Sequence, residues 1–288
     1  MWSKVHGKGR RPRLGLALSG GAARGLAHVG VLKVFAEEGL RVDCVAGTSA
    51  GALVGGALAS GMSVEELERL GRSLRWRDFG RVTLSRLGVQ SNASLEDYVR
   101  ARFPVTRFEE LAIPFAAVAT DLKTGAAVVM RDEGDVAFAV RASCAIPGWY
   151  VPVTDAEGRQ LVDGGLVANL PVSVVRALGA EVVVAVDVNH EGAKFMGPPT
   201  SVVGVLLQSM LVVQRVACEH QRQLADVCVS PRVGHLRWDE LARASEFIEA
   251  GEEAARASIP ALKELLEPQA EEDHGWFNFG RGRQVTKD

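Results

Sequence analysis

The chain has few of the residues that would build a metal site, a disulfide framework or a nucleic-acid surface. Its four cysteines lie far apart, have mostly apolar neighbours and form no Cys-x-x-Cys pair; they are Cys44, Cys144, Cys218 and Cys228. We therefore expect small core residues in a reducing compartment, with no metal ligands and no disulfides. The net charge of −2 gives no reason to expect a nucleic-acid partner.

Long apolar runs are missing as well. No apolar stretch follows the basic residues 1–13 that could complete a signal peptide. Residues 202–213 are apolar but include Gln208 and Ser209, and they are too few to span a bilayer, which needs about 20. We expect a soluble, cytoplasmic protein with an inert, flexible basic arm. The alternative is peripheral membrane contact of that arm with anionic lipid.

Strand and helix patterns alternate through the first two-thirds of the chain. This order predicts an α/β domain with a mostly parallel central sheet covered on both faces. We place one catalytic domain at 14–266, and we expect the acidic, then Gly- and Arg-rich residues 267–288 to be disordered. The apolar helix predicted at 201–220 is expected to be buried or at an interface, and it could join two copies of the chain in a homo-oligomer. Expected strands are 14–18, 43–46, 115–119, 126–130, 182–187 and 227–229, and expected helices are 26–38, 52–59, 64–74, 95–103, 135–144, 171–179 and 246–266.

The most informative motif is Gly47-Thr-Ser49-Ala-Gly51, which lies between a short apolar strand and a run of small helical residues. A G-x-S-x-G in this setting is typical of a nucleophile elbow, a turn so tight that only small residues fit beside the serine. The helix N-terminus behind Ser49 also favours developing negative charge. The alternative is a structural turn whose serine caps the helix.

A glycine-rich turn, residues 19–25, follows the first strand and opens a helix. Its N–H groups could converge as an oxyanion hole, and its members are Gly20, Gly21, Ala22, Arg24 and Gly25. A dinucleotide-binding turn is disfavoured because the G-x-G-x-x-G pattern is not met. A purely structural turn is the remaining alternative.

The general base is the open question. Among the six histidines, His190 has the best setting for a Ser-His-Asp triad, whereas His28 lies inside the first predicted helix. Asp163 follows an apolar pair and precedes Gly164-Gly165, so a sharp turn would present its carboxylate at a strand end. An Asp-Gly pair is ordinarily only a turn former. Ser143 lacks flanking elbow glycines, and we expect it to tie a helix end.

The chain resembles the bacterial patatin-like phospholipases. The resemblance rests on five pieces in this order: Ser-Gly-Gly-Ala-Ala-Arg-Gly (19–25), Gly-Thr-Ser-Ala-Gly (47–51), Ala-Thr-Asp-Leu-Lys-Thr-Gly (119–125), Arg-Ala-Ser-Cys-Ala-Ile-Pro-Gly (141–148), and Val-Asp-Gly-Gly (162–165) followed by Asn169-Leu-Pro171. Residues 14–231 match the family pattern nearly throughout. Ala22 departs from it, since glycine is commoner there.

The resemblance implies a three-layer α/β/α fold and a Ser–Asp dyad, with Ser49 as nucleophile and Asp163 as base. It also implies an oxyanion hole from residues 20–25, with Asn169 bracing the Asp163 loop. The implied activity is hydrolysis of fatty acyl esters of phospholipids or lysophospholipids, without a cofactor or metal. Arg24 is expected to be structural, although it could orient a lipid phosphate. Two alternatives remain, a catalytically silent relative and a Ser-His-Asp esterase.

Overall fold

The computed structural model describes residues 10–191 and 198–268. Within this part of the chain the central sheet has eight strands, which are β1 (Leu14–Leu18), β2 (Cys44–Thr48), β5 (Phe115–Asp121), β6 (Ala127–Arg131), β8 (Val153–Thr154), β9 (Gln160–Asp163), β10 (Val182–Val186) and β11 (Val227–Val229). Their order is β11-β10-β1-β2-β5-β9-β8, with β6 paired to β5. The five strands from β11 to β5 run parallel, whereas β6, β8 and β9 add antiparallel pairs.

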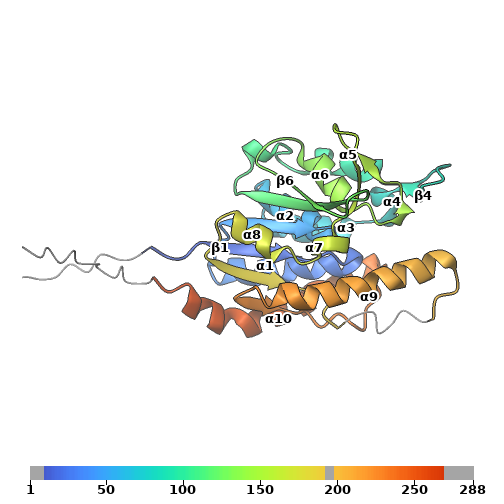
Figure 1. The fold of residues 1–288 in the computed structure, drawn as a ribbon. Helices are drawn as coiled ribbons and strands as arrows, with labels where there is room; N and C mark the ends of the chain where they lie inside the picture. The colour runs from blue at the N-terminus through green and yellow to red at the C-terminus, as the bar shows by residue number, and fades with distance from the viewer. Residues whose placement is uncertain (1–9, 192–197, 269–288) are drawn as a thin grey trace, which may run out of the picture.

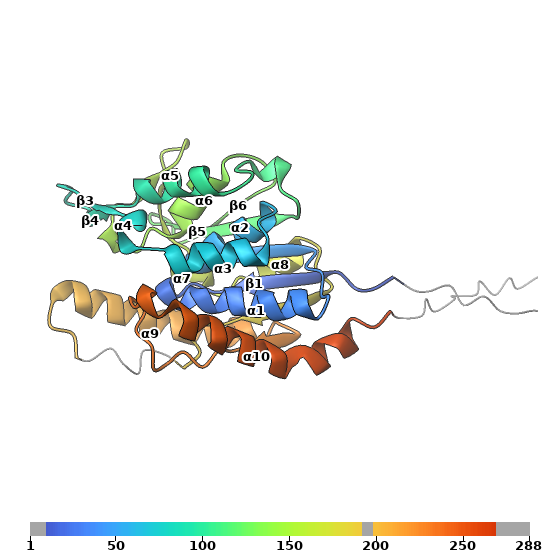
Figure 2. The ribbon, with the colours of Figure 1, turned by 180° about the vertical axis from the view of Figure 1, so that it is seen from behind.

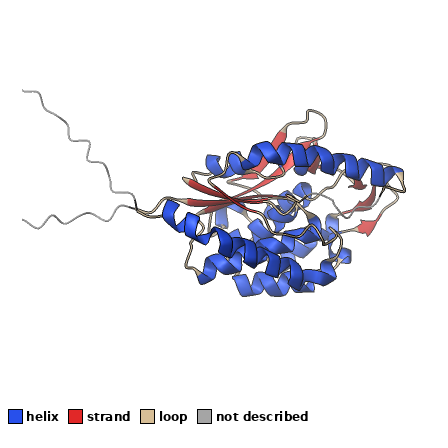
Figure 3. Ribbon diagram, turned by 90° about the horizontal axis from the view of Figure 1, so that it is seen from below, coloured by secondary structure: helices blue, strands red, loops and turns tan. Residues whose placement is uncertain are grey.

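Helices cover both faces of the sheet (Figures 1 and 3). They are α1 (Leu26–Glu37), α2 (Ala50–Ala59), α3 (Val64–Ser73), α4 (Trp76–Phe79), α5 (Ala93–Arg102), α6 (Val136–Ser143), α7 (Gly165–Ala168), α8 (Val172–Ala177), α9 (Val202–Arg222) and α10 (Ala244–Leu265), with 3-10 turns η1 (Ala22–Gly25), η2 (Phe108–Glu110) and η3 (Leu241–Arg243). Helices α1, α2 and α10 share a core with Leu14, Leu16 and Leu18, while α8 and α9 pack over the opposite face at Ala17 and Ala46. The predicted α/β class and three-layer arrangement are confirmed.

Strands β1, β2 and β10 are buried along their whole length. Such strands are apolar on both faces because helices cover both sides of a parallel sheet. Continuous apolar runs at 14–18 and 182–186 therefore give the correct strands even though they show no alternation.

Helices α1 and α10 cross in close contact on one face of the molecule (Figure 2). A Cβ atom at Gly30 would lie 1.9 Å from the Ile248 carbonyl oxygen, and one at Gly251 would lie 2.0 Å from the Ala27 carbonyl oxygen. The two backbones thus touch at a point where only glycine fits.

A second sheet of three short strands caps one edge of the domain, namely β3 (Arg81–Val82), β4 (Gly88–Ser91) and β7 (Gly148–Tyr150). The connection between α3 and α5, in which no strand is predicted, contains β3 and β4. Strand β4 pairs in parallel with β7 through Gly88 with Gly148 and Gln90 with Tyr150.

The predictions for the cysteines and for the two ends of the chain have different outcomes. Cys44, Cys144 and Cys218 are buried as expected, but Cys228 is exposed, so its assignment to the core is wrong. In the basic N-terminal segment, Arg10 pairs with Glu181. The expected disorder of 267–288 falls almost wholly outside the described residues. Among the described residues, no helix combines the length and apolar content needed to cross a bilayer.

Candidate active site

Ser49 lies in a tight turn between β2 and α2. Its backbone is left-handed, with φ 54° and ψ −120°, a conformation that non-glycine residues rarely adopt. A Cβ at Gly47 would lie 2.2 Å from the Gly51 carbonyl oxygen, and one at Gly51 would lie 2.1 Å from the Leu18 carbonyl oxygen. The strand-turn-helix geometry expected for this motif is therefore present, and both glycines are sterically required.

The strained turn is held by a side chain from the end of α6. The Ser49 N–H donates to Ser143 Oγ at 2.8 Å, and that hydroxyl donates to the Val118 carbonyl oxygen at 2.6 Å. Ser143 thus joins the elbow to β5 across a sequence separation of 94 residues. Nothing in the local pattern around Ser143 indicates this contact, so sequence analysis gave it only a helix-end role.

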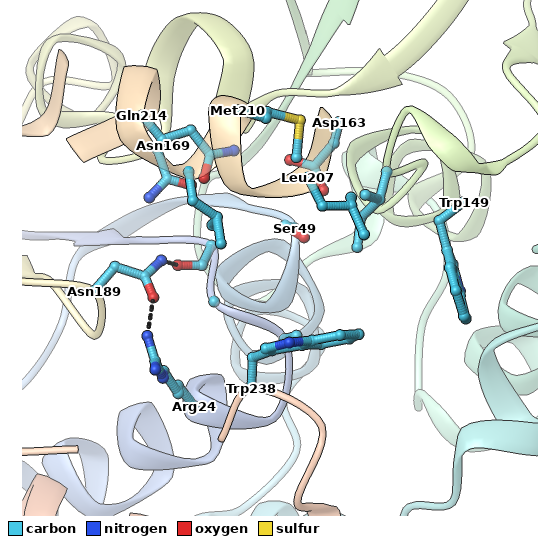
Figure 4. A pocket seen from close by; sticks show the side chains of 15 residues that line it. Arg24, Ser49, Trp149, Asp163, Asn169, Asn189, Leu207, Met210, Gln214 and Trp238 are labelled. Carbon is cyan, nitrogen blue, oxygen red and sulfur yellow. Dashed lines mark hydrogen bonds between the residues drawn. The ribbon is translucent and has the colours of Figure 1, made fainter. Parts of the chain in front are cut away.

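Asp163 ends β9 and is buried beside Ser49 (Figure 4). Ser49 and Asp163 line the same cleft, and the Gly165 N–H donates to Asp163 Oδ1 at 2.8 Å. Thr120 Oγ1 donates to the Asp163 carbonyl oxygen at 2.9 Å and fixes the strand end. Burial raises the pKa of Asp163 to about 6, while the nearby Ser49 hydroxyl and the Gly165 N–H oppose that rise.

The glycine-rich turn faces the same cleft, but not all of its N–H groups are available. The Gly20 N–H donates to the Asn169 carbonyl oxygen at 3.2 Å, and the Arg24 N–H donates to the Gly21 carbonyl oxygen at 3.1 Å. The N–H groups of Gly21 and Ala22 have no acceptor among the described residues. Ala22 is left-handed, with φ 51°. The two groups best placed to bind an oxyanion are therefore those of Gly21 and Ala22.

Gly25 ends the 3-10 turn η1 and lies against the start of α2. A Cβ at Gly25 would lie 2.5 Å from Ala50 Cβ, so this glycine lets η1 pack against the start of α2. Gly164 has a comparable role in the Asp163 loop, since a Cβ there would lie 2.2 Å from the Val118 carbonyl oxygen. A side chain at either position would collide with a neighbouring element.

Asn169 connects the Asp163 loop to the glycine-rich turn. Its side chain is buried, and its carbonyl oxygen accepts from Gly20. On the other side, Asn189 Nδ2 donates to the Gly20 carbonyl oxygen at 2.7 Å. Arg24 donates to Asn189 Oδ1 at 3.2 Å and to the Leu236 carbonyl oxygen, as Figure 4 shows in part. These contacts give Arg24 a positioning function toward the turn.

His28 and His190 both lie outside the cleft that contains Ser49 and Asp163. His28 is fully buried; its Nε2 hydrogen-bonds to the Ser19 carbonyl oxygen at 2.8 Å, and burial lowers its pKa to about 4. His190 is exposed and lines a neighbouring polar cavity. Among the described residues, no histidine lines the cleft that contains Ser49 and Asp163. The geometry gives no support to a triad through His190.

Ser49 and Asp163 open into a cleft whose walls are largely apolar. Helix α9 contributes Leu207, Met210 and Leu211 to it, and Trp149 and Trp238 lie across from that helix (Figure 4). A second apolar cavity starts at Ser49 and runs beside α2, and its lining includes Leu53, Val54, Leu74, Phe79, Leu95 and Tyr150. Among the described residues, no group of three or more His, Cys, Asp or Glu side chains could hold a metal ion.

Comparisons with known proteins show the family to which this chain belongs. Residues 16–176 match the family pattern described as patatin-like phospholipase. An uncharacterized NTE family protein of Mycobacterium tuberculosis is 38% identical over 185 residues, which cover 63% of this chain and 51% of that protein. A lysophospholipase, NTE1, of Mycosarcoma maydis is 37% identical over 183 residues, covering 61% of this chain and 10% of that protein.

Two solved structures share the fold. VipD from Legionella pneumophila has a TM-score of 0.52 at 12% identity, covering 88% of this chain and 67% of that one. The type III effector ExoU has a TM-score of 0.50 at 15% identity, covering 88% and 54%. This chain spans about half the length of its mycobacterial relative. With its match extending over more than half of the sequence, the chain belongs to the patatin-like phospholipase family.

Proposed function

We propose that this protein hydrolyses fatty acyl esters of phospholipids or lysophospholipids, with Ser49 as nucleophile and Asp163 as general base. One observation carries the proposal: a strained serine at the start of α2 opens into the same cleft as a buried carboxylate. A pKa of about 6 makes Asp163 a stronger base than an ordinary aspartate, yet leaves it ionised at neutral pH.

In the proposed cycle, Ser49 Oγ attacks the ester carbonyl carbon and its proton passes to Asp163. The carbonyl oxygen becomes an oxyanion, which the N–H groups of Gly21 and Ala22 stabilise, and each such donor is typically worth about 10²–10³ in rate. The intermediate collapses, the alcohol leaves with the proton from Asp163, and an acyl-serine remains. Water then attacks this ester while Asp163 accepts its proton, and the fatty acid departs as Ser49 recovers its hydrogen.

The apolar cavity beside α2 supports a fatty acyl substrate. It contacts Ser49 and Ala50 at one end and continues past Leu53 and Val54, one turn further along the helix. A hydrocarbon chain placed there would leave water together with these side chains, a transfer that stabilises binding by about 0.8 kcal/mol per CH₂. The carbonyl carbon of such a chain would lie at the Ser49 end.

A panel of lipids with purified protein tests the proposal. We expect release of fatty acid from at least one phospholipid or lysophospholipid class, labelling of Ser49 by a fluorophosphonate probe, and neither result with Ser49→Ala. A silent relative would leave the probe unreacted. A His190→Ala variant serves as the matched control, because a Ser–Asp enzyme keeps its activity without that side chain.

A further inference from the structure

Two exposed apolar segments flank the catalytic cleft. The loop and strands of the β3–β4 hairpin present Val82, Leu84, Leu87 and Val89, whose exposed fractions are 80%, 105%, 57% and 44%. Aliphatic side chains that project so fully into solvent on one short hairpin need a partner to cover them.

The second segment is the N-terminal part of α9. Val202, Val205 and Leu206 are exposed, whereas Leu207 and Met210 from the same turns line the cleft. The helix thus has two apolar faces, one toward the site and one toward solvent. The predicted burial of this helix is met only in part, because Leu207 and Met210 are half-buried and the outer face is exposed to solvent.

The hairpin and the start of α9 lie on the same side of the molecule, as Figures 1 and 2 both show. Strand β4 pairs with β7, and β7 carries Trp149 on the wall of the cleft. The facing wall is formed by Leu207 and Met210 of α9. The cleft therefore lies between the two exposed apolar segments.

The charge on this side differs from that of the whole chain. Residues 75–91 contain four arginines and a single acidic residue, Asp78, a balance of +3 (4 − 1) in a chain of net charge −2. Arg77, Arg81 and Arg86 are exposed. Residues 198–214 contain no charged side chain. Aliphatic side chains flanked by arginine suit a surface that offers hydrocarbon beneath anionic groups.

We propose that the β3–β4 hairpin and the first turns of α9 dock on an anionic phospholipid bilayer, with the cleft facing the membrane. Val82, Leu84 and Leu87 enter the headgroup and acyl boundary, while Arg77, Arg81 and Arg86 contact lipid phosphates. This proposal rests on the proposed function. A docked cleft would let an acyl substrate pass from the bilayer to Ser49 between Trp149 and α9. It assigns the membrane contact to this face and not to the basic N-terminal arm.

Binding is tested with the full chain carrying Ser49→Ala, so that no lipid is consumed. Sedimentation with phosphatidylcholine vesicles, with and without phosphatidylserine, measures the bound fraction. We expect strong binding only with phosphatidylserine, at least a tenfold loss with Leu84→Ser/Leu87→Ser, and a comparable loss with Arg81→Gln/Arg86→Gln. All four substituted side chains are exposed, so the fold should be retained.

Matched controls lie away from this face. Leu265 is 40% exposed at the end of α10, on the opposite side of the molecule (Figure 1). Arg41 is exposed before β2, whereas Ser49 follows the other end of that strand. Leu265→Ser and Arg41→Gln should bind vesicles like the parent chain. Equal losses in the controls and the hairpin variants would overturn the proposal, as would unchanged binding in the hairpin variants.

A second readout separates this proposal from the proposed function. With Ser49 intact, the hairpin variants should hydrolyse a short, water-soluble ester at the parental rate but lose at least tenfold on vesicle-borne lipid. If the parent hydrolyses no ester while vesicle binding still depends on Leu84 and Leu87, the proposed function fails and the docking surface stands. A dimer in light scattering that the hairpin substitutions dissociate would instead assign this face to a second copy and overturn membrane docking.

Discussion

The elbow that holds Ser49 and the crossing of α1 with α10 both depend on glycine, but for different reasons. At the crossing, Gly30 and Gly251 sit in regular helices and serve only to let two backbones touch. At the elbow, Gly47 and Gly51 make room for a turn in which a different residue, Ser49, is strained. The comparison separates glycine that serves packing from glycine that serves chemistry.

Backbone strain is found near the elbow and not at the crossing of α1 with α10. Among the described residues, three non-glycine positions have positive φ: Ala22, Ser49 and Asp132. Two of them line the cleft, and the third, Asp132, directly follows β6 in the connection to α6. Such conformations cost about 1–3 kcal/mol each and persist where surrounding contacts fix them. The hydrogen bond from Ser49 N–H to Ser143 and the packing of Gly25 on Ala50 provide that support here.

The largest predicted effect separates chemistry from packing. Ser49→Ala should lower kcat/KM for a soluble ester by at least about 10⁴, because the nucleophile is removed. The midpoint of thermal unfolding should hardly change, since alanine adopts the same strained backbone at similar cost. Steady-state kinetics and a thermal melt on one preparation measure both. A variant that unfolds would show that the hydroxyl is structural.

The reverse behaviour is expected at the crossing. Gly30→Ala should lower the free energy of unfolding by about 3 kcal/mol, because its methyl group would meet the Ile248 carbonyl oxygen. The folded fraction should keep its kcat/KM. Urea unfolding measures the loss, and Gly204→Ala is the control, because the nearest atom to its added methyl group is the Ser201 hydroxyl at 3.2 Å. Equal stability of both variants would contradict the close contact.

Titration of Asp163 gives a prediction about pH. With a pKa near 6, kcat/KM should fall about fivefold between pH 6 and pH 5 as the base becomes protonated, and about tenfold for each pH unit below that. The free energy of unfolding should change in the opposite direction and increase as the pH falls. The folded state binds the proton more tightly than the unfolded state, so the contribution of Asp163 to stability is greatest at low pH and is lost as pH rises through 6. Rate profiles and urea unfolding across pH 4–8 test both, and Asp163→Asn should remove this slope in stability.

The smallest effect is expected at Ala22. Ala22→Gly relieves a left-handed alanine but adds freedom to the unfolded chain, so the free energy of unfolding should change by no more than about 1 kcal/mol. The Gly21 and Ala22 N–H groups are kept, and kcat/KM should stay within about threefold. A tenfold loss of activity with unchanged stability would show that the alanine methyl group itself orders the oxyanion donors.

Local sequence patterns predict much of this fold. Buried strands at 14–18 and 182–186, the small-residue helix after Ser49 and the turn after Asp163 are all encoded by neighbouring residues, and each is found where expected. The pairing of Ser49 with Asp163 is different, because it joins β2 to β9 through the order of strands in the sheet. Only the resemblance to a family indicated it.

Other features depend on contacts that no short pattern contains. The Gly20 N–H donates to Asn169, and the elbow is held by Ser143, both through long-range hydrogen bonds. The two faces of α9 look alike in sequence, and only the tertiary structure decides that Met210 faces the cleft while Val213 faces solvent. No strand is predicted at the β3–β4 hairpin, because its strands are only two and four residues long.

The most direct test of the central claim is the turnover of Asp163→Asn on a soluble ester, measured on protein whose thermal unfolding shows an intact fold. Our account predicts a loss of about 10²–10⁴ in kcat/KM, because an amide cannot accept the Ser49 proton. Turnover close to that of the unaltered protein would contradict it and would require another base for Ser49.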